Sequence, residues 1–398
     1  MEHKTRIKGN VHYVGVNDRN KHRFEGMWPL PYGVSYNSYL IDDEMVALVD
    51  TVDICYFEVY LRKIKQVIGE RPINYLIINH MEPDHSGSIR LIKQHYPGII
   101  IVGNKQTFGM IEGFYGVTGE QYLVKEGDFL ALGHHKLRFY MTPMVHWPET
   151  MMTFDETDGV LFSGDGFGCF GTVDGGFLDT RINVDKYWGE MVRYYSNIVG
   201  KYGSPVQKAL QKLGGLPISA ICSTHGPVWT ENISRVIGIY DRLSRYDADE
   251  GVVIVYGSMY GNTEQMAEAI AAELSAQGIR NIVMHNVTKS HPSYILADIF
   301  RYKGLIVGSP TYSNQIFPEV ESLLSKILVR ELKGRYLGYF GSFTWAGAAV
   351  KRMAEFAEKS KFELVGDPVE MKQAMQDITY TQCENLARAM ADRLKKDR

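Results

Sequence analysis

The segment His80-Met-Glu82-Pro-Asp84-His85 places four potential metal ligands within six residues. Imidazole nitrogens and carboxylate oxygens are side-chain atoms that hold transition metals in proteins. Three more residues of these types follow at wide spacing: His146, Asp165 and His225. The seven supply four imidazoles and three carboxylates, enough for two metal ions with one bridging carboxylate. The first segment alone is also compatible with a solvated loop, but the full set in this order favours a two-metal centre.

A second group of residues has the chemistry of an anion cradle. Ser258-Met259-Tyr260-Gly261-Asn262-Thr263 stands between an apolar run and a helical pattern. Backbone N–H groups and hydroxyls at a helix N-terminus can surround a phosphate. The segment lacks the lysine of a Walker A loop and does not fit the dinucleotide GxGxxG pattern. A capped helix with a tight turn is the alternative reading.

Two later segments, 310–314 and 342–347, are expected at the same edge of the sheet, because each follows a predicted strand. They offer aromatic rings to cover a flat heterocycle and small residues whose backbone can reach its polar edge. Ligands of open α/β sheets bind beyond the carboxyl ends of the strands, where the three segments would meet. The residues expected to line this site are Pro310, Thr311, Tyr312, Ser313, Asn314, Ser342, Phe343, Thr344, Trp345, Ala346 and Gly347, together with the first segment.

The elements that position the metal ligands are short strands and helices within the first 240 or so residues. Helical periodicity is present at Ile89, Ile92 and Tyr96, ending at Pro97–Gly98. Strands with helices packed outside them predict an α/β sandwich. The predicted strands are 39–41, 46–49, 75–78, 99–102, 137–141, 160–162 and 220–222.

The chain changes character near 244–251, where SRYDADEG reads as a linker. Beyond it, β and α patterns alternate regularly, beginning with an apolar run at 252–256 that is typical of a strand buried on both faces. A helix with Met266, Ile270 and Leu274 on one face follows. Further strands are predicted at 282–287, 305–307, 336–340 and 362–365. We therefore expect two domains, 1–250 and 251–398, the second a doubly wound parallel sheet of five strands.

Composition excludes several classes of protein. A formal net charge of −3 over 398 residues argues against a nucleic-acid partner. The four cysteines, Cys55, Cys169, Cys222 and Cys383, form no CxxC pair, so a zinc ribbon, a rubredoxin module and a thioredoxin-type motif are unsupported. The N-terminus MEHKTRIKGN lacks the apolar core of a signal peptide, and no apolar run is long enough to span a bilayer. A cytoplasmic protein without membrane contact is expected.

The N-terminal ligand pattern resembles the metallo-β-lactamase superfamily, whose motif HxHxDH is followed by distant His, Asp and His. This chain departs at one position, because Glu82 replaces the second histidine. A carboxylate is a harder, anionic ligand that suits iron better than zinc. Glu82 is also the pattern of the flavodiiron (A-type flavoprotein) family, and 258–263 resembles the flavodoxin loop that binds the FMN phosphate. The resemblance covers essentially the whole chain.

The resemblance implies an αββα sandwich with two irons, followed by a flavodoxin-like domain with FMN. One iron would be held by His80, Glu82 and His146, the other by Asp84, His85 and His225, with Asp165 bridging them. Whether His85 binds iron is left open, because water replaces the equivalent side chain in some members of the family. Tyr195 resembles a tyrosine near the irons, with a plain core aromatic as the alternative.

The implied function is reduction of dioxygen to water, of nitric oxide to nitrous oxide, or of both. A diferrous pair and a reduced FMN deliver two electrons each, and dioxygen requires four. Because the chain stops after one flavodoxin-like domain, an external donor is expected: rubredoxin first, a reduced deazaflavin as the alternative. The family pairs the FMN of one subunit with the irons of another, which implies a head-to-tail homodimer or a dimer of dimers. Preference between the two gases is not resolved by the sequence.

Two other functions compete with this interpretation. The first is a zinc-dependent hydrolase of the metallo-β-lactamase superfamily with an appended flavodoxin-like domain. The second is a non-catalytic electron carrier whose N-terminal domain only docks a partner. Zinc as the dominant metal, with thioester hydrolysis, would favour the first. A flavin spectrum without iron would favour the second.

Overall fold

The computed structural model describes residues 5–397, which form two compact units, the first ending at Ser244 and the second beginning at Arg245. The N-terminal stretch that lacks a signal-peptide pattern falls partly on residues 1–4, outside the described residues. Among the described residues, no helix combines the length and the apolar character that crossing a bilayer requires. Both units mix helices and strands, as predicted.

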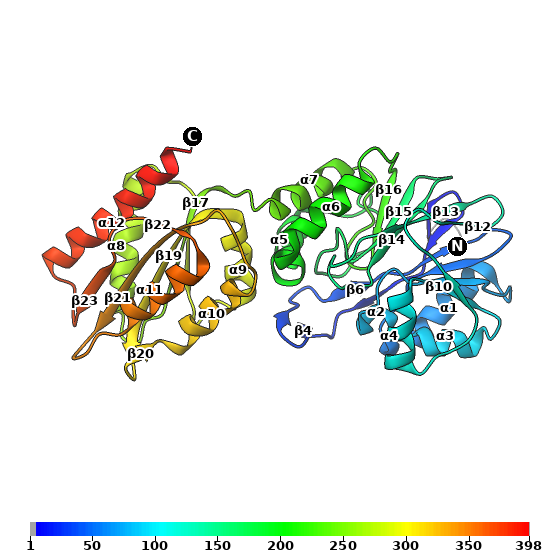
Figure 1. Cartoon of the computed structure of the whole chain (residues 1–398), viewed down its shortest axis with the longest axis horizontal. Coiled ribbons are helices and arrows are strands. Elements are labelled where there is room, and N and C mark those ends of the chain that lie inside the picture. Colours follow the sequence, from blue (N-terminus) through cyan, green and yellow to red (C-terminus); the bar gives the residue numbers. More distant parts are fainter. Residues whose placement is uncertain (1–4, 398) are drawn as a thin grey trace. The chain divides into compact units, whose positions relative to one another are not determined.

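The first unit contains two facing sheets, with helices on the outside; Figure 1 shows α1, α3 and α4 on one outer side and α5 to α7 on the other. In spatial order, the seven-stranded sheet consists of β1 (Arg6–Lys8), β2 (Val11–Tyr13), β7 (Tyr39–Ile41), β8 (Ala47–Val49), β9 (Tyr75–Ile77), β10 (Ile100–Gly103) and β11 (Gln121–Leu123). The five-stranded sheet consists of β12 (Phe129–Ala131), β13 (Lys136–Met141), β14 (Met151–Asp155), β15 (Val160–Gly164) and β16 (Ala220–Ser223).

Two small ladders stand apart from these sheets. They are β3 (Val16–Asp18) with β6 (Val34–Tyr36), and β4 (Arg23–Phe24) with β5 (Trp28–Pro29). The helices of the unit are η2 (Ile54–Tyr56), α1 (Phe57–Ile68), α2 (Pro83–Ser86), α3 (Ile89–His95), α4 (Lys105–Tyr115), α5 (Asp185–Tyr194), the π-helical η3 (Tyr195–Val199), η4 (Gly200–Tyr202), α6 (Gly203–Leu213) and α7 (Ile233–Ser244).

The core of this unit lies between the two sheets. Side chains of β2 and β7 to β10 meet side chains of β12, β13, β15 and β16 in one buried apolar cluster. Every residue of β14 and β15 is buried, because each is covered on both faces. That double cover explains why 160–162 in β15 is a continuous apolar run rather than an alternating one.

The predicted metal ligands all follow strands that point to one edge of the sandwich. The segment from His80 to His85 comes after β9, and α2 begins within it. His146 lies between β13 and β14, Asp165 directly follows β15, and His225 comes just after β16. Because β14 runs antiparallel to both β13 and β15, and β16 runs parallel to β15, the carboxyl ends of β13, β15 and β16 meet at the same edge.

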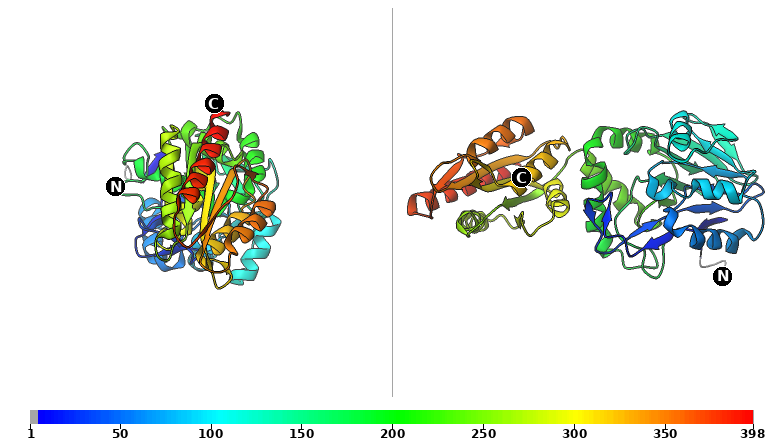
Figure 2. Two further views of the ribbon diagram at one scale, coloured as in Figure 1. Left: turned by 90° about the vertical axis from the view of Figure 1, so that its left-hand side faces the viewer. Right: turned by 90° about the horizontal axis from the view of Figure 1, so that it is seen from below.

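The second unit is a parallel sheet in the order 2-1-3-4-5, which is the flavodoxin-like doubly wound order. Its strands, across the sheet, are β18 (Ile282–Asn286), β17 (Asp249–Tyr256), β19 (Tyr302–Tyr312), β21 (Tyr336–Phe343) and β22 (Glu363–Leu364). Its helices are α8 (Asn262–Ala276), α9 (Pro292–Arg301), α10 (Pro318–Leu328), α11 (Ala349–Ser360) and α12 (Asp377–Lys395). Figure 2 shows α8 and α12 packed side by side.

Two strands of this unit run further than the sequence indicated. The sequence predicts a strand over 305–307, but β19 continues to Tyr312 and turns back into β20 (Gln315–Ile316). Ser313 and Asn314 both have positive φ, 48° and 57°, which is the backbone of a tight two-residue hairpin turn. Similarly, β21 extends to Phe343 and pairs along its end with β23 (Val369–Lys372), a strand that the prediction lacked. The segments that follow the predicted strands 305–307 and 336–340 are therefore partly held in strand pairing.

A buried histidine gives the first unit a pH-dependent stability. His135 Nδ1 lies 2.9 Å from Asp155 Oδ2. Burial alone would lower the pKa of His135, but the hydrogen bond and charge of Asp155 raise it above 6.5. A folded-state pKa above the unfolded one means that this stabilisation is complete below pH 6.5 and is lost as the pH rises through the higher folded value. The difference in unfolding free energy between the wild type and His135→Gln should therefore shrink as the pH rises above 6.5. Urea titrations of both proteins check this; a constant difference would contradict it.

Candidate metal centre and cofactor pocket

The structure brings all seven predicted metal ligands together, and their facing atoms fall into two groups. The first group surrounds the imidazole of His146. Its Nε2 lies 3.0 Å from Asp165 Oδ2, 3.1 Å from Glu82 Oε2 and 3.3 Å from His80 Nε2. Four side chains from three distant parts of the chain thus point their ligand atoms at one spot.

The second group faces the other oxygen of Asp165. His85 Nε2 lies 3.2 Å from Asp165 Oδ1 and 3.6 Å from Asp84 Oδ1. His225 Nε2 lies 3.4 Å from Asp84 Oδ2 and 3.5 Å from Asp165 Oδ1. Each oxygen of Asp165 therefore serves a different group, as a carboxylate shared by two metal ions would.

Several polar atoms of the centre are buried without a hydrogen-bond partner among residues 5–397. They are both carboxylate oxygens of Asp84, both ring nitrogens of His85 and Nε2 of His225. Each buried polar atom that lacks a partner lowers the stability of the folded protein by about 1–3 kcal/mol, and by more when the group is charged. A metal ion satisfies lone pairs of this kind at once. The donor set, with three carboxylates among four imidazoles, fits a pair of iron ions.

The charges of the centre shift its pKa values strongly. Burial, and after it the negative charge of Glu82, raise the pKa of Asp84 to about 6. Burial opposes the ionisation of Asp165, but the imidazole of His85 and a hydrogen bond from His146 hold the pKa of Asp165 well below its ordinary value. Asp165 is thus an anion at any physiological pH, as a bridging ligand must be.

Neighbouring groups fix the orientation of these side chains. Glu149, fully buried, accepts hydrogen bonds from His80 Nδ1 at 2.7 Å and from the Met81 N–H at 2.9 Å. His225 Nδ1 donates to the carbonyl of Ser35 at 2.8 Å. Both contacts leave Nε2 of the histidine free for a metal and fix the ring. The sequence prediction missed Glu149, although it stands only three residues after His146.

We expect Glu149→Gln to lower iron affinity about tenfold and Glu149→Ala about a hundredfold, because partners of metal-bound histidines contribute factors in this range. Glutamine keeps an acceptor oxygen but loses the charge, whereas alanine loses both. Chelator competition with the ferrous protein measures the affinities. Glu156→Gln, which removes a surface partner of Arg138, is the matched control. Equal affinities for all four proteins would refute a positioning role for Glu149.

The tyrosine next to the centre is Tyr194, one residue before the predicted Tyr195. The Tyr194 ring lies 5.8 Å from that of His225. Burial, and after it the charge of Asp165, raise the pKa of the Tyr194 phenol well above 10. Tyr195 is equally buried, but its ring meets that of Tyr240 at 5.1 Å. Adjacent helical residues point about 100° apart, and a π-helical turn begins at Tyr195.

A solvent-connected cavity of about 390 Å³ reaches the centre from outside. Glu82 and Asp84 of the centre line it, together with Lys21, Phe24 and Glu25. Phe24 is buried and its ring lies 5.3 Å from that of His225. A small molecule can therefore enter from solvent on the side of the carboxylates.

The second unit has a cavity of about 490 Å³ at the carboxyl ends of its strands. The first turn of α8 borders it without a side-chain cap, so its backbone N–H groups are available to an anion. Thr263 Oγ1 lies 2.9 Å from Ser342 Oγ, and Thr311 Oγ1 accepts the Ala348 N–H at 3.0 Å. These bonds hold the three predicted segments together.

The lining of this cavity differs from the prediction at three positions. Gly261 and Gly347 do not border it, whereas Gln373, beyond β23, does. Gly261 instead has a φ of 92° and starts α8, so its role is conformational. Tyr260 and Trp345 are 91% and 85% exposed, which leaves large aromatic faces open beside the cavity. All the other predicted residues line it.

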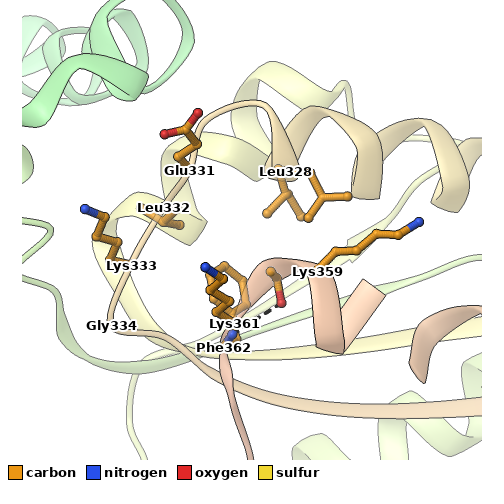
Figure 3. Close-up of a pocket in the computed structure, with 10 residues that line it drawn as sticks. Leu328, Glu331, Leu332, Lys333, Gly334, Lys359, Lys361 and Phe362 are labelled. Carbon is orange, nitrogen blue, oxygen red and sulfur yellow. Dashed lines mark hydrogen bonds between the residues drawn. The ribbon is translucent and has the colours of Figure 1, made fainter. Parts of the chain in front are cut away.

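Another cavity of the second unit, about 380 Å³, has the opposite character (Figure 3). It lies at the amino ends of β21 and β22, beside Lys333, Lys359 and Lys361. The helices that border it, α10 and α11, present their C-terminal ends, where the helix dipole disfavours phosphate. This cavity therefore lacks the phosphate-binding geometry of the first one.

Comparisons with known proteins agree with this arrangement of sites. Residues 34–226 match the family model described as ODP family beta lactamase, and residues 254–385 match the flavodoxin model. The anaerobic nitric oxide reductase flavorubredoxin of Vibrio vulnificus is 33% identical over 368 residues, covering 90% of this chain and 73% of that protein.

Solved structures resemble the chain over almost its whole length. The rubredoxin oxygen:oxidoreductase from Desulfovibrio gigas aligns with a TM-score of 0.94 and 31% identity, covering 98% of each chain. The flavodiiron protein from Giardia intestinalis aligns with a TM-score of 0.91 and 27% identity, covering 98% of this chain and 97% of the other. On the strength of its fold, its two matched domains and these relatives, the chain belongs to the flavodiiron protein family.

Proposed function

We propose that this protein is a flavodiiron oxidoreductase that reduces dioxygen to water, nitric oxide to nitrous oxide, or both, with electrons delivered through FMN. One observation carries the proposal: the two oxygens of Asp165 face separate groups of ligand atoms. The same chain has a cavity with an uncapped helix N-terminus at the edge where doubly wound sheets bind cofactors. The relatives named above carry out reactions of this class by name.

The proposed ligands follow the two groups of atoms. His80, Glu82 and His146 would hold one iron, and Asp84, His85 and His225 the other, with Asp165 between them. The position of His85 Nε2, 3.2 Å from Asp165 Oδ1, supports its inclusion as a ligand. Glu82 in place of a neutral histidine supports iron over zinc, and so disfavours the hydrolase alternative.

When bound, the diiron pair would supply electrons and open coordination positions for the gas. The protein residues hold the pair in place and shield it from bulk water. His85, Asp165 and His225 are each at most 1% exposed, and the cavity lined by Glu82 and Asp84 provides an approach from solvent. The buried phenol of Tyr194, next to Asp165, would donate a hydrogen bond into the same space.

The cavity of the second unit would hold FMN. The phosphate would lie at the first turn of α8 against Ser258, Asn262 and Thr263, and the isoalloxazine between Tyr312 and Trp345. The volume of about 490 Å³ is within the range of ordinary cofactor sites. The protein would bind and orient the flavin, while the redox chemistry belongs to the flavin itself.

We propose rubredoxin as the electron donor, with a reduced deazaflavin as the other donor to be assayed. The name of the Desulfovibrio gigas relative, rubredoxin oxygen:oxidoreductase, supports rubredoxin. A head-to-tail homodimer, or a dimer of two such dimers, and a cytoplasmic location are also proposed. The four cysteines are free thiols, which fits a reducing compartment.

The test is gas consumption by the iron- and FMN-loaded protein, followed with dioxygen and nitric oxide electrodes. Reduced rubredoxin is supplied in one series and reduced deazaflavin in a second. We expect sustained uptake of at least one gas, and loss of that uptake in His146→Ala. Absence of uptake of both gases with both donors would refute the proposed function.

A further inference from the structure

Tyr36 is a second buried tyrosine beside the centre, on the side of Asp84 and His225. It ends β6, and its ring lies 6.0 Å from that of His225. The neighbouring Ser35 accepts His225 Nδ1 through its carbonyl and the Gly226 N–H through its hydroxyl, both at 2.8 Å. These bonds tie β6 to the ligand loop and hold the Tyr36 ring against the imidazole.

The hydroxyl of Tyr36 has no hydrogen-bond partner among residues 5–397, although the side chain is fully buried. Buried hydroxyls in native proteins are nearly always satisfied by protein, water or ligand. The two oxygens of Asp84 and Nε2 of His225 are also without partners. Residues with an unsatisfied donor and with unsatisfied acceptors thus both border His225: the Tyr36 ring lies 6.0 Å from the His225 ring, and Asp84 Oδ2 lies 3.4 Å from His225 Nε2.

Lys21 connects the Tyr36 ring with the cavity that opens to solvent. Lys21 Nζ lies 5.3 Å from the ring centroid and 3.2 Å from Asp53 Oδ2. Lys21 and Asp84 both line the cavity that connects the centre to solvent. A small polar molecule entering by this route would therefore reach the Tyr36 side of the centre.

We propose that the Tyr36 hydroxyl donates a hydrogen bond to a small oxygen- or nitrogen-terminated ligand bound beside Asp84 and His225. The ligand class comprises diatomic gases, water or hydroxide, and short anions such as azide. The assignment rests on the proposed function, because it requires iron at the second group. Tyr36 would act there in addition to Tyr194, whose phenol lies near Asp165.

The test compares azide binding to the oxidised, iron-loaded wild type and Tyr36→Phe, followed by the change in visible absorbance. Phenylalanine keeps the ring and removes only the hydroxyl. We expect the azide Kd to rise about tenfold, the contribution of a hydrogen bond to an anion. Tyr187→Phe is the matched control, because it removes a buried hydroxyl that donates to the carbonyl of Thr172 at 2.6 Å. Its azide Kd should equal that of the wild type.

An azide Kd in Tyr36→Phe within twofold of the wild type would overturn the inference. So would loss of iron from Tyr36→Phe, since a ligand donor is not needed to retain the metal. Neither of these two results for Tyr36→Phe contradicts the proposed function if the wild type binds iron and consumes gas. A wild type that binds neither iron nor azide would instead overturn the proposed function and the inference together.

Discussion

Replacing Asp165 by asparagine should lower gas reduction at least about a hundredfold, since even residues that only contact a metal ligand contribute up to that factor. Asparagine has nearly the same shape but only one acceptor oxygen and no charge. It cannot face both groups of ligand atoms as the two oxygens of Asp165 do. Iron content and electrode rates of the purified variant measure the two losses together.

Asp179→Asn provides the control for loss of a buried carboxylate as such. Asp179 is 5% exposed and accepts hydrogen bonds from the backbone N–H groups of Thr230, Glu231 and Asn232, away from the ligands. The Asp179→Asn variant should be less stable than the wild type but should keep its iron content and its rate of gas reduction per iron. Full iron content and full activity in Asp165→Asn would mean that this carboxylate does not bridge the metals.

Asn262→Asp should weaken FMN binding by about a hundredfold or more. Asn262 is the first residue of α8, where the proposed phosphate would lie. Two unit charges of like sign 4 Å apart repel by about 4 kcal/mol near a protein surface, and the phosphate carries more than one charge. The helix itself should not suffer, because an aspartate at the first turn interacts favourably with the helix dipole.

Riboflavin separates this charge effect from damage to the pocket. It has the same ring system without the phosphate, so its affinity should be equal in the wild type and in Asn262→Asp. Fluorescence titration of the flavin-free protein with each flavin gives the four dissociation constants. A parallel loss of riboflavin and FMN affinity would place the phosphate elsewhere or show that the pocket had collapsed.

Much of the fold follows from local patterns in the sequence. The apolar runs at 39–41 and 160–162 become β7 and β15, because strands covered on both faces need apolar side chains at every position. The ligand residues His80 to His85 could be found because they lie within one segment, and the later ones because they follow strand ends. Residue type and element boundaries are both local information.

Other parts of the site depend on tertiary contacts that no local pattern encodes. Glu149 binds His80 across 69 positions of the chain, and its place three residues after His146 does not indicate that pairing. Tyr194 and Tyr195 are adjacent and identical, so only the packing of α5 decides which one meets His225. The extension of β19 to Tyr312 depends on pairing with β20, which forms only once the Ser313–Asn314 turn closes.

The most direct test of the account is the metal and flavin content of the protein purified without oxygen. Seven converging side chains with three carboxylates predict two irons per chain, and the second unit predicts one FMN. That result, with iron lost from His146→Ala and FMN retained, would match the structure. Zinc as the dominant metal, together with thioester hydrolysis and no consumption of either gas, would contradict it.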